Sequence, residues 1–282
     1  MPQCPPPDSN GLCAMILVMD AVPSGLLAGK RLLVTGVVNT ESIAFAVARA
    51  ALLGGAQVAL TTHDRVRELT EWAAASLSDP VLILTLDVTV PEHFSQVAAQ
   101  VQAEMGGLDG VLHAVAFGPR DTLSGDFLSA SDEGIELAMR TSTISFARLA
   151  ALLADTAEGP AAIVGLDFDA DGRAWPVYNW MGVVKLALQG VMRYTARDLG
   201  PRGIRSNLVA AGPLNTRAAS GIGGFEKLLA AYASTAPLGW NPDDPSAVAD
   251  TVCFLLSDLG RGITGEIIHV DGGYNAMAAA IR

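Results

Sequence analysis

A tyrosine and a lysine seven residues apart are the most informative pair in this sequence of 282 residues. Tyr178 and Lys185 lie in a stretch with helical periodicity. Seven residues bring a helix back to nearly the same face, about 10 Å farther along its axis. A phenol and an ammonium group can therefore reach one cleft. The plain structural alternative is an interfacial tyrosine and a lysine that extends its charge to water.

Lys185 is unusual because lysine is scarce in this chain. Lys30, Lys185 and Lys227 are its only lysines among 18 basic residues. Val184 and Leu186 flank Lys185, so a buried ammonium there needs a dedicated partner. We therefore favour a functional role for this lysine over a surface role.

A turn with a single glycine follows the first apolar run. Gly36 permits a tight turn there, although the three-glycine fingerprint of dinucleotide-binding proteins is absent. Ser42 stands where the next helix would have its N-cap, and the N–H groups of that helix end could hold a pyrophosphate. The pattern predicts a cofactor turn, with an ordinary strand, turn and helix as the alternative.

The second apolar run ends at His63 and Asp64. A carboxylate at this place can accept hydrogen bonds from the adenosine ribose, which favours NAD over NADP. His63 could cover the adenine face. Asp64 could instead cap the following helix. Arg65 and Arg67 keep NADP open as a minority reading.

Polar and small residues follow the next two apolar runs. Asp87 comes after the third run and could accept a hydrogen bond from the adenine amino group. After the fourth run, Ala114, Val115 and Ala116 are small enough for a dinucleotide to lie flat against the strand end. His113 is interpreted as an ordinary hydrogen-bonded histidine.

Seven apolar runs alternate with helical patterns along the chain. Strands are expected at residues 31–34, 56–62, 81–86, 110–116, 161–166, 204–209 and 267–270, and helices at 42–53, 64–77, 91–105, 131–153, 178–199 and 245–256. This alternation predicts an α/β fold: a Rossmann-like, doubly wound, seven-stranded parallel sheet with helices on both faces. Ligands of such sheets bind beyond the carboxyl ends of the strands.

Composition excludes several classes of protein. The net charge of −11 argues against broad binding of nucleic acid, and no apolar stretch reaches the ~18 residues of a membrane span. Cys4, Cys13 and Cys253 lack metal-ligand spacing, so no metal site is expected, and so few cysteines suggest a reducing cytoplasm. Residues 1–24 are expected to be a proline-rich disordered tail, and 25–282 a single catalytic domain.

Several longer motifs accompany these residues. They are Gly36-x5-Ser42-Ile43, Leu86-Asp87-Val88, and the segments 164–169, 178–181, 206–213, 236–241, 264–266 and 270–273. With them the chain resembles the enoyl-acyl-carrier-protein reductases of the short-chain dehydrogenase/reductase superfamily, most closely the mycobacterial ones, over roughly Gly25 to Gly273. Ala114 and Ala116 depart from the Ser and Gly of the mycobacterial enzymes, which puts cofactor affinity in question, not cofactor use.

The resemblance implies a role for each catalytic residue. Tyr178 would hydrogen-bond the thioester carbonyl, Lys185 would hold the nicotinamide ribose hydroxyls, and Phe168 would lie beside the nicotinamide. The residues expected at the cofactor are Gly36, Val38, Ser42, Ile43, His63, Asp64, Asp87, Val88, Ala114, Val115, Ala116, Lys185, Ala211, Gly212, Pro213, Leu214 and Thr216. Phe117 and Ala218 are expected to join Tyr178 at the substrate.

The function implied is reduction of the carbon–carbon double bond of trans-2-enoyl thioesters by NADH in fatty acid biosynthesis. The thioester would be carried by acyl carrier protein or CoA, and the enzyme would be a cytoplasmic homo-oligomer, a tetramer by resemblance. A lid at about 213–237 would cover the acyl chain. Because this segment is shorter than its mycobacterial counterpart, preference for short and medium acyl chains is expected.

Two other functions compete with this one. A carbonyl reductase or alcohol dehydrogenase of the same fold typically carries Tyr-x-x-x-Lys after a serine, whereas here Gly182 stands four residues after Tyr178 and Phe168 lies where the serine could act. A non-catalytic dinucleotide-binding protein on this scaffold stays open because of Ala114 and Ala116.

Overall fold

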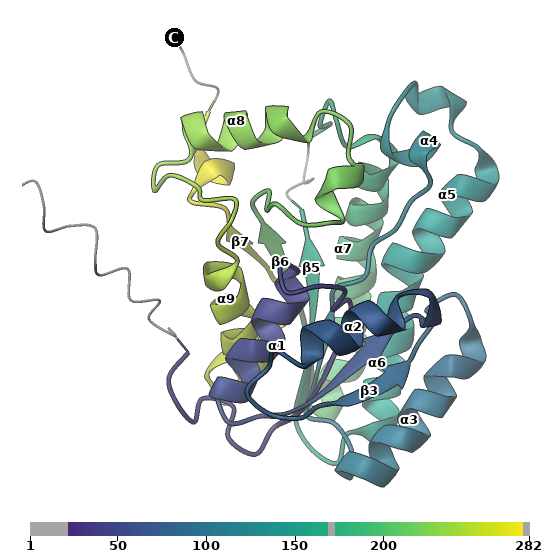
Figure 1. Cartoon of the computed structure of the whole chain (residues 1–282), viewed down its shortest axis with the longest axis vertical. Coiled ribbons are helices and arrows are strands. Elements are labelled where there is room, and N and C mark those ends of the chain that lie inside the picture. Colours follow the sequence, from purple (N-terminus) through teal and green to yellow (C-terminus); the bar gives the residue numbers. More distant parts are fainter. Residues whose placement is uncertain (1–21, 169–172, 279–282) are drawn as a thin grey trace, which may run out of the picture.

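Seven parallel strands form one sheet in the computed structural model, which describes residues 22–168 and 173–278 (Figure 1). The strands lie in the order β3-β2-β1-β4-β5-β6-β7. They are β1 (Arg31–Val34), β2 (Gln57–Thr62), β3 (Leu82–Thr85), β4 (Gly110–His113), β5 (Ala161–Asp167), β6 (Ile204–Ala211) and β7 (Ile267–Val270). The expectation of a Rossmann-like parallel sheet is confirmed.

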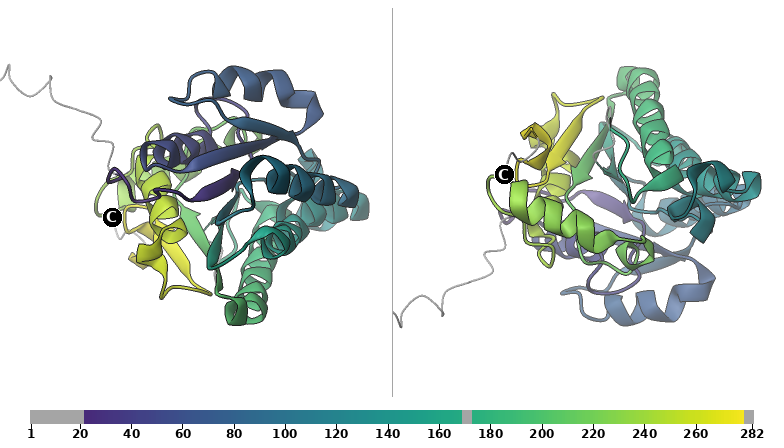
Figure 2. Two further views of the ribbon diagram at one scale, coloured as in Figure 1. Left: turned by 90° about the horizontal axis from the view of Figure 1, so that it is seen from below. Right: turned by 90° about the horizontal axis from the view of Figure 1, so that it is seen from above.

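Helices cover both faces of the sheet (Figure 2). One hydrophobic core joins the sheet to α1 (Ile43–Leu53) and α9 (Ser246–Leu256), which pack against each other. The other core lies under α3 (Pro91–Met105), α6 (Ser145–Thr156) and α7 (Asn179–Leu199). Of the helices in the described ranges, none is long and apolar enough to cross a membrane.

The shorter helices lie around this framework. They are α2 (Arg67–Ala74), α4 (Arg120–Leu123), α5 (Asp132–Met139) and α8 (Phe225–Thr235). In Figure 1, α8 crosses the end of the molecule toward which the arrows of β5 and β6 point. The carboxyl ends of the strands, where such folds bind ligands, are therefore roofed by the segment expected to be the lid.

The fourth strand is shorter than the sequence pattern suggests. It ends at His113 and does not reach Ala116, because the backbone N–H of Ala114 leaves the ladder and donates to the Thr35 hydroxyl, 3.0 Å away. The Thr35 hydroxyl in turn donates to the carbonyl of Leu112 at 2.9 Å. The side chain of Thr35, the residue after β1, thus ends β4 and frees the following residues to form a loop.

The helix expected at 131–153 is interrupted. A π-helical turn, Arg140–Ile144, separates α5 from α6, because hydroxyl side chains here bond to other parts of the chain. Thr143 donates to the carbonyl of Val184 in α7 at 2.8 Å. Ser142 both accepts from the N–H of Phe117 and donates to its carbonyl. Such turns are frequent at functional sites, and this one fixes the loop after β4.

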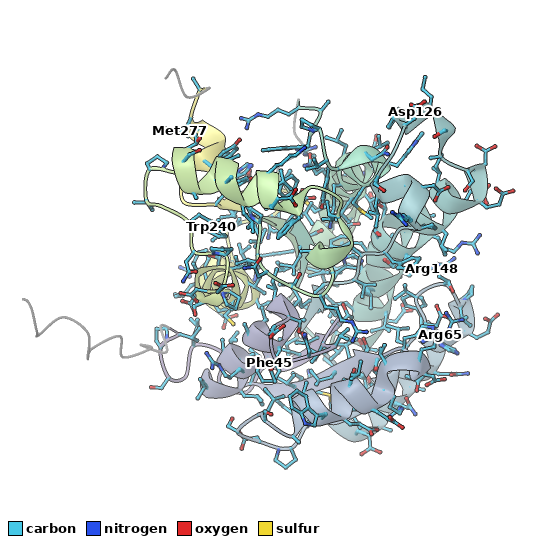
Figure 3. The ribbon with its side chains drawn as sticks, turned by 45° about the horizontal axis from the view of Figure 1, so that its top comes forward. Phe45, Arg65, Asp126, Arg148, Trp240 and Met277 are labelled. Atoms are coloured by element: carbon cyan, nitrogen blue, oxygen red, sulfur yellow. The ribbon has the colours of Figure 1, made fainter. Side chains whose placement is uncertain are left out.

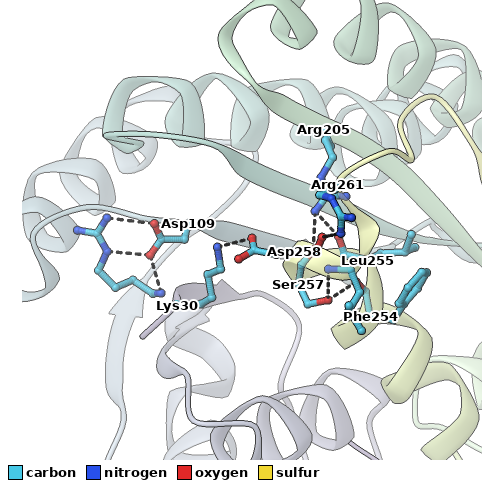
Figure 4. A network of polar contacts seen from close by, with 10 residues as sticks. Lys30, Asp109, Arg205, Phe254, Leu255, Ser257, Asp258 and Arg261 are labelled. Atoms are coloured by element: carbon cyan, nitrogen blue, oxygen red, sulfur yellow. Dashed lines mark hydrogen bonds and ion pairs between the residues drawn. The ribbon is translucent and has the colours of Figure 1, made fainter. Parts of the chain in front are cut away.

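At the other end of the sheet, where the strands begin, charged side chains hold neighbouring segments together (Figure 4). The Nε of Arg31 donates to Asp109 at 2.9 Å, and Lys30 pairs with Asp258 at 2.8 Å. Arg205 donates to the carbonyl of Leu255 at 2.6 Å. These side chains join the amino ends of β1, β4 and β6 to their neighbours, so their role is structural.

The domain begins earlier than expected. Val22 is only 7% exposed and packs in the α1 and α9 core, where its side chain lies against Gly54. Assigning Val22 to the disordered tail 1–24 was therefore wrong, because one buried apolar residue within a polar, proline-rich segment gives no periodic signal. Residues 1–21 of that tail lie outside the described residues.

Val22→Ala should lower the free energy of unfolding by about 1–3 kcal/mol, since it removes two buried methyl groups from a packed core. Denaturant unfolding followed by circular dichroism measures the change. Ser24→Ala is the matched control, because Ser24 is exposed and its loss should change stability by less than about 0.5 kcal/mol. Equal stability of the two variants would show that Val22 does not belong to the core.

Candidate active site

The carboxyl ends of β1 and β4 lie next to each other, and a turn follows each of them. β1 pairs with β2 on one side and β4 on the other, so the strand order reverses here, which is where dinucleotides bind in this architecture. Gly36 follows β1 with φ +87°. A Cβ at this residue would collide with the carbonyl oxygen of Ala114. Glycine is thus required at 36 both by its backbone angle and by the close approach of the two turns.

The amino terminus of α1 follows the turn after β1. Ser42 is its N-cap: its hydroxyl accepts from the N–H of Phe45 at 3.2 Å and donates to the carbonyl of Asn39 at 2.8 Å. Val38 and Ile43 beside it are half-buried. A helix amino terminus carries unpaired N–H groups and a partial positive charge, so it suits the phosphates of a dinucleotide.

His63 and Asp87 come together at the ends of β2 and β3. The Nδ1 of His63 accepts from the N–H of Arg65, which leaves Nε2 to face the Asp87 carboxylate at 3.3 Å. Burial opposes ionisation of Asp87, but hydrogen bonds from Thr89 outweigh it and lower the pKa of this carboxyl. An imidazole and a carboxylate at this spot suit the face and the amino edge of an adenine. Val88 beside them is buried.

Asp64 does not cap the helix that follows it. The N-cap of that short 3-10 turn is His63, whereas Asp64 accepts from the Thr85 hydroxyl at 2.9 Å and is exposed. The capping alternative is therefore wrong, and the carboxylate of Asp64 lies at the surface between β2 and β3. Its contact with a ribose remains a prediction.

Tyr178 and Phe168 form the centre of the site. Their ring centroids are 4.6 Å apart, and both side chains are buried, at 8% and 6% exposure. Tyr178 is the N-cap of α7, and the next residue, Asn179, has φ +42°, the sole positive φ outside glycine in the described ranges. A left-handed residue at the start of a helix costs conformational energy and marks a constrained turn. That turn sets the direction of the Tyr178 ring.

The phenol of Tyr178 is held in its neutral form. Burial raises the pKa of Tyr178 well above its usual value, and the nearby Asp167 carboxylate raises it further. A neutral phenol has a proton to donate throughout the working pH range. It can therefore stabilise an oxygen that gains negative charge.

Lys185 has the dedicated partners that its apolar neighbours require. Its ammonium donates to the carbonyl of Leu166 at 2.8 Å, and it attracts the buried carboxylate of Asp167. Gln189, one helical turn farther along α7, donates to Asp167 at 3.0 Å. Burial dominates at both charged groups, lowering the pKa of Lys185 and raising that of Asp167. Because an ammonium has three donors, its bond to Leu166 leaves donors for ligand hydroxyls.

Asp167 and Gln189 were not assigned roles from the sequence. Asp167 stands within the recognised motif 164–169, whose last residue lies outside the described ranges, and Gln189 is four residues after Lys185 on the same helix face. The i, i+4 spacing could have placed Gln189 beside Lys185, but no local signal pairs it with Asp167. Ser142 was also missed; its signal is the run of three hydroxyl residues at 141–143 inside an apolar helix.

His113 is a structural residue, as interpreted from the sequence. It is fully buried, and its Nε2 lies 2.8 Å from the Ser145 hydroxyl. Since Ser145 already donates to the carbonyl of Thr141, Nε2 is the donor to Ser145. Burial, reinforced by the Lys185 charge, lowers the pKa of His113 to about 3. The imidazole is neutral under ordinary conditions.

Trp240 holds the segment after β6 in place. The indole of Trp240 lies against Gly212, where a Cβ would meet its ring at 2.6 Å, and its N–H donates to the carbonyl of Pro213 at 2.7 Å. Figure 3 shows Trp240 on the α8 side of the molecule. Ala211 and Leu214 are buried beside this turn. The close stacking explains why Gly-Pro follows the strand.

A third hydrophobic cluster surrounds the central tyrosine, apart from the two cores that flank the sheet. Its buried members are Ala138, Phe168, Tyr178, Met181, Val184, Leu228 and Tyr232. Leu228 and Tyr232 come from α8, so the expected lid packs into the same cluster as Tyr178 and Phe168. The surroundings of the Tyr178 ring are therefore apolar.

Four predicted residues lie at the margin of the site. Phe117 is 52% exposed, Ala116 and Ala218 are exposed, and the Thr216 hydroxyl accepts from Ala219 within the lid. Neither Phe117 nor Ala218 belongs to the cluster around Tyr178. Their contacts with substrate and cofactor stay predictions, as do those of Val115.

Known proteins resemble this chain over most of its length. The family model described as enoyl-(acyl carrier protein) reductase matches residues 36–275. An enoyl-[acyl-carrier-protein] reductase [NADH] of Mycolicibacterium smegmatis is 42% identical, covering 89% of this chain and 97% of that protein. Enzymes with the same name from Neisseria meningitidis and Escherichia coli are 42% and 37% identical, each covering 90% of this chain and 98% and 97% of their own. The chain therefore belongs to the enoyl-(acyl carrier protein) reductase family.

Proposed function

We propose that this protein reduces the carbon–carbon double bond of trans-2-enoyl thioesters with NADH, in fatty acid biosynthesis. The observation that carries the proposal is the buried pair of Tyr178 and Phe168 in an apolar cluster, with Lys185 two turns along the same helix. The names of the relatives, which specify an enoyl-acyl-carrier-protein substrate and NADH, support the same conclusion.

The residues present fit a nicotinamide dinucleotide. Close packing of Gly36 on Ala114 leaves small groups at the strand ends, and the amino terminus of α1 would hold the pyrophosphate. His63 and Asp87 would hold the adenine, and Lys185 the nicotinamide ribose hydroxyls. When bound, this cofactor supplies the hydride.

The side chains of this protein bind the thioester and stabilise the negative charge that develops on its oxygen. As the double bond is reduced, negative charge accumulates on the thioester oxygen. The neutral phenol of Tyr178 donates a hydrogen bond to that oxygen, in a site from which water is excluded by Phe168 and the lid. The carbonyl of Leu166 fixes one proton of the Lys185 ammonium and so orients the other two. Gln189 holds the Asp167 carboxylate beside that charge.

The same geometry disfavours an alcohol dehydrogenase or carbonyl reductase. Those enzymes place a lysine four residues after the tyrosine, where this chain has Gly182.

The purified protein should oxidise NADH when a trans-2-enoyl-CoA or trans-2-enoyl-acyl-carrier-protein is added, and should leave 3-oxoacyl thioesters unreduced. The decrease of NADH absorbance measures both reactions, with NADPH as a parallel cofactor. Equal turnover of the 3-oxoacyl substrate would refute the proposal. Binding of NADH without turnover of either substrate would favour a dinucleotide-binding protein.

We also propose that the natural substrate is carried by acyl carrier protein, and that the cytoplasmic enzyme is a homotetramer. Exposed apolar side chains on and beside the outer face of α7, namely Ile144, Val183 and Leu186, support packing between subunits. Each is more than one third exposed in the single chain, which is unusual for three neighbouring large aliphatic residues.

A further inference from the structure

A series of neighbouring aromatic rings extends outward from Tyr178 and Phe168. The ring of Phe168 lies 5.2 Å from that of Trp175, which is 6.2 Å from Tyr232 and 5.8 Å from Tyr274. Tyr232 and Tyr274 stack in parallel, with centroids 3.9 Å apart and planes 8° from one another. The rings come from the loop after β5, from α8 and from the segment after β7, which meet only in the folded chain.

Trp175 is the link between these segments. It is half-buried, outside any helix or strand, and it contacts Phe168 on one side and the two stacked tyrosines on the other. Arg173, two residues earlier, donates to the carbonyl of Asn275 at 2.9 Å, next to Tyr274. The hydrogen bond of Arg173 and the ring contacts of Trp175 therefore hold this loop against the segment that follows β7.

The position of this ring chain bears on the acyl group of the substrate. An enoyl thioester whose oxygen meets Tyr178 must place its acyl chain in the apolar cluster around that residue, because this is where apolar surface can be buried. Large rings with few rotatable bonds already fill the side of the cluster that faces α8. Such rings cannot compress to admit further methylenes.

We propose that Trp175, with Tyr232 and Tyr274, forms a wall that limits the length of the acyl chain, and that the substrates are short- and medium-chain enoyl thioesters. This inference rests on the proposed function. Each methylene buried before the wall raises affinity about fourfold, and those beyond it gain nothing or clash. The wall thus determines where kcat/KM stops rising with chain length.

The test measures kcat/KM for trans-2-enoyl-CoA substrates from about four to about sixteen carbons at saturating NADH. The unchanged protein should reach its maximum at a short or medium length. Trp175→Ala should move the maximum to longer chains and raise the ratio of long-chain to short-chain kcat/KM by at least about tenfold, the gain expected from two newly buried methylenes. Trp175→Phe, which keeps a ring, should move it far less.

Trp180→Ala is the matched control. Trp180 is two residues from Tyr178, and Trp175 is three, but Trp180 stacks on Phe127 at 4.8 Å and donates to the Phe127 carbonyl, outside the wall. Tyr274→Ala opens the wall from another segment and tests the same inference if Trp175→Ala does not fold. The melting temperature and the Kd for NADH show whether each variant is folded. Tyr232 is unsuitable because it is fully buried.

The outcomes separate this inference from the proposed function. Absence of turnover with every enoyl thioester would defeat the proposed function itself. An active protein whose chain-length profile is the same in Trp175→Ala and Tyr274→Ala would overturn the wall, as would an equal shift in Trp180→Ala. A maximum at the longest chains in the unchanged protein would overturn it too.

Discussion

Tyr178→Phe should lower kcat for enoyl thioester reduction by roughly 10- to 1000-fold, the loss expected when one donor to a developing oxyanion is removed. The phenylalanine ring keeps the contact with Phe168, whose centroid is 4.6 Å away, so packing should be little changed. The hydroxyl is the only group removed. The Kd for NADH should therefore stay within about threefold of the original, since Tyr178 acts on the thioester and Lys185 on the cofactor.

The pH dependence gives this prediction a second readout. Because burial and the Asp167 charge raise the pKa of Tyr178, the phenol stays protonated as pH rises through neutrality. Activity should accordingly show no alkaline loss due to this tyrosine below about pH 10, its reference value. Single-turnover rates at several pH values, compared with those of Tyr178→Phe, measure this. If Tyr178→Phe abolished NADH binding instead, the assigned division of roles would be wrong.

Lys185→Met should weaken NADH binding by about 10- to 100-fold, which corresponds to losing one hydrogen bond from a charged donor. Methionine fills the same apolar space on α7 between Val184 and Leu186, so the loss reports the charge and not a cavity. It also removes the positive neighbour of the buried Asp167 carboxylate, whose pKa should rise further. Quenching or enhancement of NADH fluorescence on binding measures Kd directly.

Lys30→Met is the control for this variant. Lys30 makes the same kind of charged contact, an ion pair with Asp258 at 2.8 Å, but it lies at the amino end of β1, away from the proposed cofactor site (Figure 4). It should leave the Kd for NADH unchanged and alter stability by no more than about 1 kcal/mol, the range for exposed ion pairs. An unaltered Kd in Lys185→Met would mean that this lysine serves the fold alone.

Several features of this protein follow from local sequence. The seven-residue spacing of Tyr178 and Lys185 indicates from the sequence alone that the two residues serve one site, although the turn at Asn179, and not the helical period, sets the direction of the Tyr178 ring. The seven strands could be predicted because buried parallel strands are continuous apolar runs. Gly36 and Ser42 could be located because a positive φ and a helix N-cap each demand particular residue types. These are short-range constraints, and each can be recognised within one window of sequence.

Other features depend on contacts between residues far apart in sequence. The wall at Trp175 requires rings from three segments, and Tyr274 lies about a hundred residues from it, so no local pattern reveals that they meet. The contact of Gln189 with Asp167 likewise requires β5 to lie beside α7. Val22 is buried because folding brings it into contact with Gly54, 32 residues later in the sequence. Local sequence determined which elements form and which groups could react. The tertiary structure alone decided what surrounds those groups, since burial and ring packing arise from the simultaneous placement of distant segments.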